Sequence, residues 1–204
     1  MAHSLIYINL QSVDTRLIFL VNQGTANGLF DVLMPALSEQ GYLLVLPFIL
    51  LLFLQAAQKR NEQGKTFIAV AFWTVLIAYC AISCAGWMEE ILKVSTARVR
   101  PCRALEGIRL ITTCPSSYSM PSGHAISSFA CALPFFYLTR EYLAMMWRWY
   151  PIVLAALIAF SRIYLGAHYP TDVLVGAFLG TLIGLILSVL FQVIAIKAIM
   201  RKAD

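Results

Sequence analysis

Charged side chains are scarce in this sequence. Asp, Glu, Lys and Arg make up 12% of the 204 residues and hydrophobic residues make up 60%, whereas soluble globular domains average about 25% charged residues. Water is therefore not the solvent for most of the chain. The formal net charge is +5, but the Lys and Arg residues are scattered between apolar runs and form no basic stripe. This distribution argues against a nucleic-acid partner.

The sequence also lacks features that would divide it or direct its cleavage. It contains no linker, low-complexity tract or internal repeat, so we expect a single membrane-embedded domain over residues 1–204. No Lys or Arg precedes the first apolar run, and polar residues interrupt that run, so we expect no cleaved secretory signal.

Long apolar stretches dominate the remainder. A helix needs about 20 apolar residues to cross the hydrocarbon core, and backbone groups in lipid must be satisfied within a helix or a closed barrel. Each of the expected spans carries at most one ionisable residue. They are Gly41–Ala57, Thr66–Met88, Met120–Thr139, Trp149–Ala167 and Val173–Ile196. The expected fold is all-α, a polytopic transmembrane bundle of about five spans over residues 41–204.

The first forty residues have a different pattern. Polar and charged side chains break any run long enough to span, while apolar residues recur at intervals of three and four. That stripe consists of Ile6, Leu10, Val13, Leu17 and Leu20. It predicts an amphipathic helix lying in the membrane interface, followed by a short second helix over Asn27–Ser38. A sixth span in this segment is the alternative.

The Lys and Arg residues predict the orientation. Those between the first and second spans, between the third and fourth, and after the fifth place these segments on the cytoplasmic side. Residues 89–119 and 161–172 then face outward. The first of these segments nevertheless holds five cations, Lys93, Arg98, Arg100, Arg103 and Arg109. This departure from the positive-inside pattern suggests that some of the cations have a function.

Three cations, two imidazoles and one carboxylate gather with Ser122 and Gly123 where four helix ends meet the outer face, and ionisable groups at membrane depth are functional candidates. They are Lys93, Arg100, Ser122, Gly123, His124, Arg162, His168 and Asp172. Pro121 suits the first turn of a helix, which would leave the following backbone N–H groups free to bind an anion. Pro170 likewise places Asp172 in a first turn, about one turn from His168. The carboxylate could then fix one ring nitrogen and leave the other as a nucleophile.

The residues match three motifs in order. Lys93-x6-Arg100-Pro101, Pro121-Ser122-Gly123-His124 and Ser161-Arg162-x5-His168-x3-Asp172 occupy 93–101, 121–124 and 161–172. The chain resembles the type 2 phosphatidic acid phosphatase superfamily, which also contains glucose-6-phosphatase and the vanadium haloperoxidases.

The resemblance implies a role for each matching residue. His168 would attack phosphorus and form a phosphohistidine, with Asp172 holding its tautomer. His124 would protonate the leaving lipid oxygen and then activate water. The phosphoryl oxygens would be bound by Lys93, Arg100, Ser122, Gly123 and Arg162. The remaining loop cations, Arg98, Arg103 and Arg109, match no fixed position, and we expect them to be solvated or in contact with lipid headgroups.

The expected function is hydrolysis of a terminal phosphate from a lipid phosphate or diphosphate, such as undecaprenyl diphosphate, phosphatidylglycerol phosphate, phosphatidic acid or lipid A 1-phosphate. The alternatives are a haloperoxidase-like enzyme that uses vanadate, and a non-catalytic lipid-binding or transport protein. We expect no cofactor and no metal, because the outer cluster offers no ligand set once the histidines and Asp172 are assigned. Expected partners are the lipid substrate and the bilayer, in an inner membrane with the site facing the periplasm.

Two cysteines, Cys102 and Cys114, share the outward loop. That compartment would be oxidising, and a bridge would close the loop between the first two motifs. Spacing alone leaves their pairing open.

Overall fold

The computed structural model describes residues 2–58 and 62–200, and this part of the chain is helical with no strand. The elements are α1 (Ala2–Asn22), α2 (Gly28–Gln40), the 3-10 helix η1 (Gly41–Leu44), α3 (Val45–Gln58), α4 (Glu62–Thr96), α5 (Pro101–Ala104), α6 (Gly123–Leu138), α7 (Met145–Tyr164) and α8 (Pro170–Met200). The predicted all-α fold is confirmed. Each stretch expected to span overlaps one helix, α3, α4, α6, α7 or α8, although α4 continues to Thr96, past the predicted end at Met88.

The surface of the bundle is apolar. Large hydrophobic side chains are exposed along α3, α4 and α8, among them Leu50, Phe72, Trp73, Phe178 and Ile186. Three helical stretches are long and apolar enough to cross a membrane, namely Gly28–Gln58, Gly64–Ala104 and Pro170–Ala195, and α6 is apolar but shorter. Exposed apolar faces of this extent suit a lipid environment rather than water.

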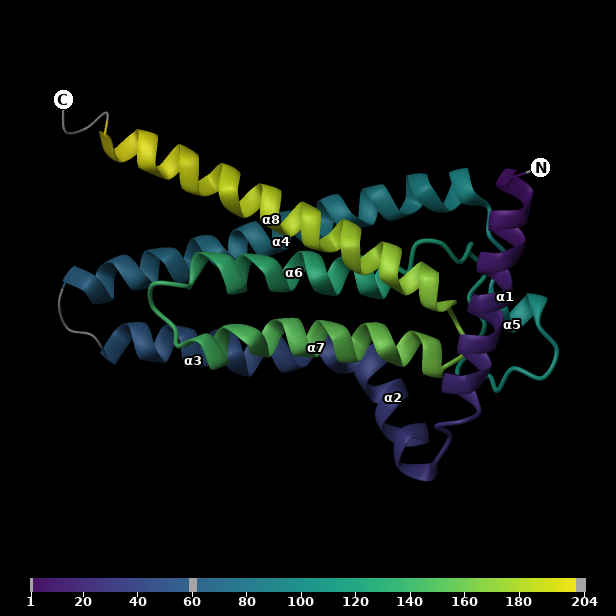
Figure 1. Ribbon diagram of the computed structural model, residues 1–204. Coiled ribbons are helices and arrows are strands. Elements are labelled where there is room, and N and C mark those ends of the chain that lie inside the picture. The colour runs from purple at the N-terminus through teal and green to yellow at the C-terminus, as the bar shows by residue number, and fades with distance from the viewer. Residues whose placement is uncertain (1, 59–61, 201–204) are drawn as a thin grey trace.

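Helix α6 forms the centre of the bundle, between α4, α7 and α8 (Figure 1). Small residues on α8 allow its backbone to approach α6 closely. A methyl group added to Gly180 would lie 2.2 Å from the carbonyl oxygen of Ile126, and one on Gly176 would lie 2.7 Å from that of Ser122. Glycines four residues apart commonly permit such packing between membrane helices. The close approach fixes the start of α6 against the start of α8.

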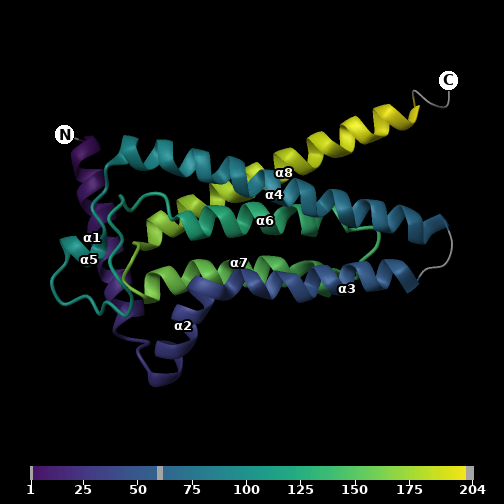
Figure 2. The ribbon, with the colours of Figure 1, turned by 180° about the vertical axis from the view of Figure 1, so that it is seen from behind.

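Helix α1 lies across one end of this bundle, beside α5 and the start of α8, as Figures 1 and 2 both show. Its apolar stripe faces outward, since Val13, Leu17 and Leu20 are exposed. Ile6 and Leu10, which belong to the same predicted stripe, lie outside the residues whose side chains are described. The opposite face of α1 is buried and includes the polar residues Asp14 and Asn22. The predicted helix therefore exists, and the face that contacts protein combines Asp14 and Asn22 with the fully buried Ile18.

The second helix begins close to its predicted position. Asn27 is the N-cap of α2, and its side chain accepts a hydrogen bond from the N–H of Phe30. This contact satisfies one of the free amides at the start of the helix. Pro35 lies inside α2, which continues through η1 into α3.

Candidate active site

The three motifs converge at the end of the bundle that α1 covers. Helices α4 and α7 end there, and α6 and α8 begin there (Figure 1). Electrostatic interactions connect His124 with Lys93, Arg100, Arg162 and His168. The structure thus brings the sequence-predicted residues into one cluster, built from four helix ends and the loops between them.

His168 lies in the short loop between α7 and α8, and its side chain is 2% exposed. Its Nδ1 is 2.8 Å from the backbone carbonyl oxygen of Ser119, and its Nε2 is 2.9 Å from Nη1 of Arg100. A carbonyl oxygen only accepts and a guanidinium only donates hydrogen bonds. Nδ1 therefore carries the proton, and the Nε2 lone pair faces the guanidinium of Arg100. Burial lowers the pKa of His168 to about 4, which keeps the ring neutral near pH 7.

Asp172 supports this arrangement less directly than the sequence indicated. Its Oδ2 is 3.7 Å from Nδ1 of His168, so the Ser119 carbonyl, not the carboxylate, is the closer partner that fixes the tautomer. Oδ2 instead accepts hydrogen bonds from the Ser119 hydroxyl and, at 2.9 Å, from the N–H of Tyr169. Oδ1 pairs with Nη1 of Arg98 at 2.5 Å. Asp172 thus orders the segments around His168 and supplies negative charge close to the ring.

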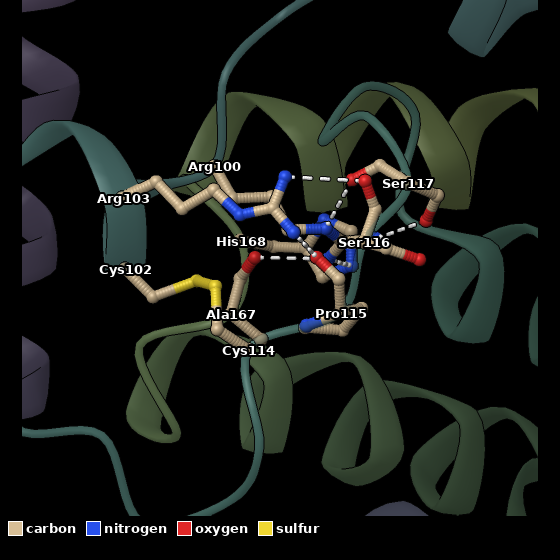
Figure 3. The surroundings of a disulfide bond; sticks show 9 residues. All are labelled: Arg100, Cys102, Arg103, Cys114, Pro115, Ser116, Ser117, Ala167 and His168. Carbon is tan, nitrogen blue, oxygen red and sulfur yellow. Dashed lines mark hydrogen bonds between the residues drawn. A yellow bond between two sulfur atoms is a disulfide. The ribbon is translucent and has the colours of Figure 1, made fainter.

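Arg100 connects the first motif to the third. It is 3% exposed, and it donates from Nε to the Ser117 carbonyl at 2.8 Å and from Nη1 to the Ala167 carbonyl at 3.1 Å. Figure 3 shows its guanidinium between these groups and the ring of His168, with the disulfide nearby. That disulfide joins Cys102 to Cys114 and closes the loop that follows the first motif. The disulfide thereby ties the end of this loop at Cys114 to the segment that carries Arg100.

The second motif forms the start of α6, with one difference from expectation. Pro121 follows a cis peptide bond and precedes the N-cap, Ser122, so it is not in the first helical turn. The Ser122 N–H is also not free, because it donates to the Asp172 carbonyl at 3.0 Å. Gly123 and His124 are the first helical residues, and their N–H groups have no carbonyl one turn earlier to bind. These two amides, with that of Ala125 in the same turn, could donate to an anion at the helix terminus.

A side-chain carboxylate lies at this terminus. A methyl group placed on Gly123 would come within 2.2 Å of Oε1 of Glu89. The same carboxylate pairs with Nζ of Lys93, one turn along α4. Glu89 therefore occupies part of the space that Lys93 and the start of α6 offer to an anion.

Arg162 approaches from the last turn of α7 and is 7% exposed. Its Nη1 donates to the hydroxyl of Ser38, a residue of α2 that no sequence motif identified. Among side chains that the structure describes, the buried polar atoms without a hydrogen-bond partner are Nε of Arg162 and Oγ of Ser122. Buried polar groups are almost always paired. Two unpaired buried polar atoms beside the motif cations are expected at a site that binds an oxygen-rich anion.

His124 borders an apolar cavity of about 210 Å³. The ring of Tyr42 lies against its imidazole, with the centroids 6.4 Å apart. The cavity extends from there into the bundle between α3, α6 and α7, where its lining includes Cys131, Leu154 and Ile158. Its size and apolar lining suit part of a hydrocarbon chain attached to the anion.

Sequence reasoning missed the ion pairs of Arg98. We expected a solvated or headgroup-bound cation, yet Arg98 pairs with both Asp172 and Asp14, each at 2.5 Å. Its guanidinium also lies 4.1 Å from the centre of the Tyr169 ring. The sequence could have indicated that Asp14 has a partner, because a carboxylate within an apolar interfacial helix requires one.

The other two loop cations also have protein partners. Arg109 forms a two-pronged ion pair with Asp31 of α2, with Nη2 2.7 and 2.8 Å from the carboxylate oxygens, and its backbone N–H donates to the Asn22 side chain. Arg103 is exposed and donates to the carbonyls of Pro115 and Ser116. The expectation is therefore wrong for Arg98, whereas the exposed Arg103 and the partly exposed Arg109 remain compatible with solvated loop charges. Among the residues that the structure describes, no group of three or more His, Cys, Asp or Glu side chains could hold a metal ion.

Comparison with known proteins identifies the family. The family model described as the PAP2 superfamily matches residues 73–195, which is more than half of the chain. The chain belongs to the PAP2 superfamily. The match begins within α4 and includes all three motifs, whereas α1 and α2 lie outside it.

Individual relatives match different shares of the chain. An undecaprenyl-diphosphatase from Sulfolobus acidocaldarius is 34% identical over 95 residues, which are 46% of this chain and 44% of that protein. Phosphatidylglycerophosphatase B from Bacillus subtilis is 33% identical over 54% of this chain and 55% of its own. The chain thus spans about half the length of these curated relatives. The crystal structure of Aquifex aeolicus LpxE is similar over 86% of this chain and 94% of its own, with 25% identity and a TM-score of 0.63.

Proposed function

We propose that this PAP2 protein is an integral membrane phosphatase that removes the terminal phosphate of a lipid phosphate or diphosphate through a phosphohistidine intermediate. The observation that carries the proposal is the state of His168. Its Nδ1 proton is held by the Ser119 carbonyl, and its Nε2 lone pair faces Arg100. A neutral, oriented imidazole next to a phosphate-binding cation is suited to nucleophilic attack on phosphorus.

In the first step, Nη1 of Arg100 moves its hydrogen bond from Nε2 of His168 to a phosphoryl oxygen of the substrate. The freed Nε2 lone pair then forms a bond to phosphorus as the bond to the lipid oxygen breaks. His124 gives a proton to that oxygen, and the lipid leaves as an alcohol or, from a diphosphate, as a monophosphate. Arg100, Arg162 and Lys93 neutralise charge on the equatorial oxygens. The unpaired Ser122 hydroxyl and Arg162 Nε supply further donors. Positioning and charge stabilisation of this kind account for most catalysis of phosphoryl transfer.

In the second step, water attacks phosphorus and the bond to Nε2 breaks. His124, now neutral, takes a proton from that water, and inorganic phosphate leaves. His168 returns to its starting tautomer because Nδ1 keeps its proton throughout. A carboxylate next to the ring, here Asp172, stabilises the positive charge that the imidazole acquires while it is phosphorylated.

The apolar cavity beside His124 and the membrane-compatible surface support a lipid substrate. The named relatives act on different lipids, an undecaprenyl diphosphate and a phosphatidylglycerophosphate. The motif residues contact only the phosphate in the mechanism above. We therefore propose the class, a phosphate on a membrane-anchored chain, as the substrate.

We further propose that the site faces the periplasm of an inner membrane, with α1 and α2 lying in the interface. The Cys102–Cys114 disulfide at the active-site end supports an oxidising compartment. Arg140, in the connection between α6 and α7, and Arg148, in the first turn of α7, lie at the end of these helices opposite the site, as the positive-inside pattern requires of the cytoplasmic side.

The test is phosphate release by the purified protein in detergent from a panel of undecaprenyl diphosphate, phosphatidylglycerol phosphate, phosphatidic acid and lipid A 1-phosphate. We expect turnover of at least one lipid, retention of activity in EDTA, and inhibition by vanadate, which mimics pentacoordinate phosphorus. Absence of turnover on every lipid would instead support a binding or transport protein. Halide oxidation with added vanadate and peroxide would support the haloperoxidase alternative.

Arg100 and Arg103 provide a matched pair for this assay, because they lie three residues apart, at the N-cap and in the last turn of α5. Arg100→Gln should lose at least about 10³-fold in turnover, the contribution of a phosphate-binding Arg in related chemistry. Arg103→Gln removes only contacts to loop carbonyls and should remain within about twofold. Equal losses in the two variants would mean that the loop needs both charges for folding, and the assigned role of Arg100 would be lost.

A further inference from the structure

Asp14 is a buried carboxylate on α1, a helix outside the family match. Its side chain is 2% exposed, although the neighbouring residues Val13 and Leu17 face outward. Removing a carboxylate from water is costly unless charged partners and hydrogen bonds replace the water. The position of Asp14 therefore depends on the groups that contact it.

Those groups belong to the first and third motif regions. Oδ1 of Asp14 accepts a hydrogen bond from the backbone N–H of Thr171 at 3.0 Å, and Oδ2 accepts one from the Thr171 hydroxyl. Thr171 lies in the first turn of α8, where amides lack intrahelical partners and favour a negative charge. Asp14 thus caps α8 from another helix, immediately before Asp172.

The second connection passes through Arg98. Nη2 of Arg98 pairs with Asp14 at 2.5 Å and Nη1 pairs with Asp172 at 2.5 Å. The same Nη1 donates to the Thr171 hydroxyl at 2.7 Å. Two carboxylates share one guanidinium, so the group carries a net negative charge next to His168.

We propose that Asp14 is a positioning residue for the phosphatase reaction, acting through Arg98 and Thr171 on Asp172; this inference rests on the proposed function. When Nε2 of His168 bonds to phosphorus, the ring becomes positive and the nearby negative charge stabilises it. Without the charge of Asp14, Arg98 would be balanced by Asp172 alone, and less negative charge would remain for the imidazole. The N-terminal helix is therefore part of the catalytic apparatus.

The experiment compares Asp14→Glu with Asp14→Gln, two side chains of similar shape that differ in charge, using a lipid that the wild type hydrolyses. Asp14→Gln should lower kcat by about 10-fold or more, as loss of a partner one contact removed from a functional group commonly does. Asp14→Glu should retain more of the rate, and KM should change by less than about twofold in both. In an Arg98→Met background, the difference in kcat between the two substitutions should be smaller, because only the connection through Thr171 remains.

The control is Asp31→Asn, which breaks the other ion pair between an N-terminal helix and a loop arginine, Asp31–Arg109. It should leave kcat within about twofold, with rates expressed per folded protein from gel filtration. Equal kcat for Asp14→Glu and Asp14→Gln, or effects that add to Arg98→Met, would overturn the inference while the phosphatase assignment stands. A wild-type protein without turnover on any lipid would overturn both.

Discussion

The two histidines of the site differ in how they are held. His168 is buried, and both of its ring nitrogens have a partner, the Ser119 carbonyl and Arg100. His124 is half-buried at the start of α6 and lies against the ring of Tyr42. Among the contacts of the described residues, no hydrogen bond reaches its imidazole. The ring of His168 is held at both nitrogens, and the ring of His124 borders a cavity.

This difference matches two kinds of chemistry. A nucleophile must direct one lone pair at phosphorus, so fixing its ring lowers the entropic cost of attack. A general acid and base must serve the leaving lipid oxygen first and a water molecule second, which requires an accessible ring without competing partners. The geometry thus favours His168 as the nucleophile and His124 as the proton carrier.

The largest expected effect separates these roles directly. His168→Ala should abolish turnover for every substrate, since it removes the imidazole nitrogen that we propose as the nucleophile. His124→Ala should lower turnover by about 10²- to 10⁴-fold on a lipid alkyl phosphate, the usual contribution of a general acid. A substrate with a phenolic leaving group needs little protonation and should recover part of the loss in His124→Ala only.

The measurement is the rate of phosphate release from both substrates, together with alkaline quenching to trap phosphate on His168. Rescue of His168→Ala by the phenolic substrate would reverse the two assignments. Near-normal turnover by His168→Ala would remove the covalent mechanism altogether.

A smaller effect is expected at Asp172. In serine proteases the corresponding Asp→Asn change costs about 10⁴-fold, because the ring takes the wrong tautomer. Here the Ser119 carbonyl already holds Nδ1, so Asp172→Asn should cost nearer about 10²-fold through lost charge and loop order. A loss as large as that of His168→Ala, measured by the same assay on folded protein, would mean that the carboxylate itself sets the tautomer.

Much of this arrangement could be predicted from the sequence. Hydropathy located α3, α4, α6, α7 and α8 because each is a long run of apolar residues with few charges. Motif spacing identified the residues that meet at the site. The boundary of α6 was less accurate, because the residue that caps the helix is Ser122, and the preceding Pro121 therefore falls outside the first turn.

The sequence could not show which charges pair. Asp14 and Thr171 are 157 residues apart, and Ser38 and Arg162 are 124 apart. Helical periodicity describes which face a residue occupies and contains no information on its partner in another helix. Arg98 accordingly looked like a loop cation, although it joins two carboxylates.

The pH dependence tests how firmly His168 is enclosed. Burial lowers its pKa from 6.5 to about 4, so the ring should stay neutral and nucleophilic as the pH falls from about 8 to 5. Protonation, and loss of the nucleophile, should occur only as the pH approaches 4. The measurement is the NMR titration of imidazole resonances in detergent, assigned with His168→Ala. A midpoint near 6.5 would show that water reaches the ring, and the contrast with His124 would weaken.

The smallest expected effect concerns the accessible histidine alone. Tyr42 is the aromatic neighbour of His124 and also lines the cavity beside it. Tyr42→Ala should widen that space and allow the imidazole of His124 to leave the position from which it protonates the lipid oxygen. We expect turnover of an alkyl phosphate to fall by about threefold to tenfold, a fraction of the full general-acid contribution. Tyr42→Phe keeps the ring and should remain near wild type.

Because His168 is fixed by Ser119 and Arg100 independently of Tyr42, the loss in Tyr42→Ala should disappear with a phenolic leaving group. A loss that is the same for both leaving groups would place Tyr42 in phosphate binding or folding instead, and the two histidines would no longer be separable by their surroundings.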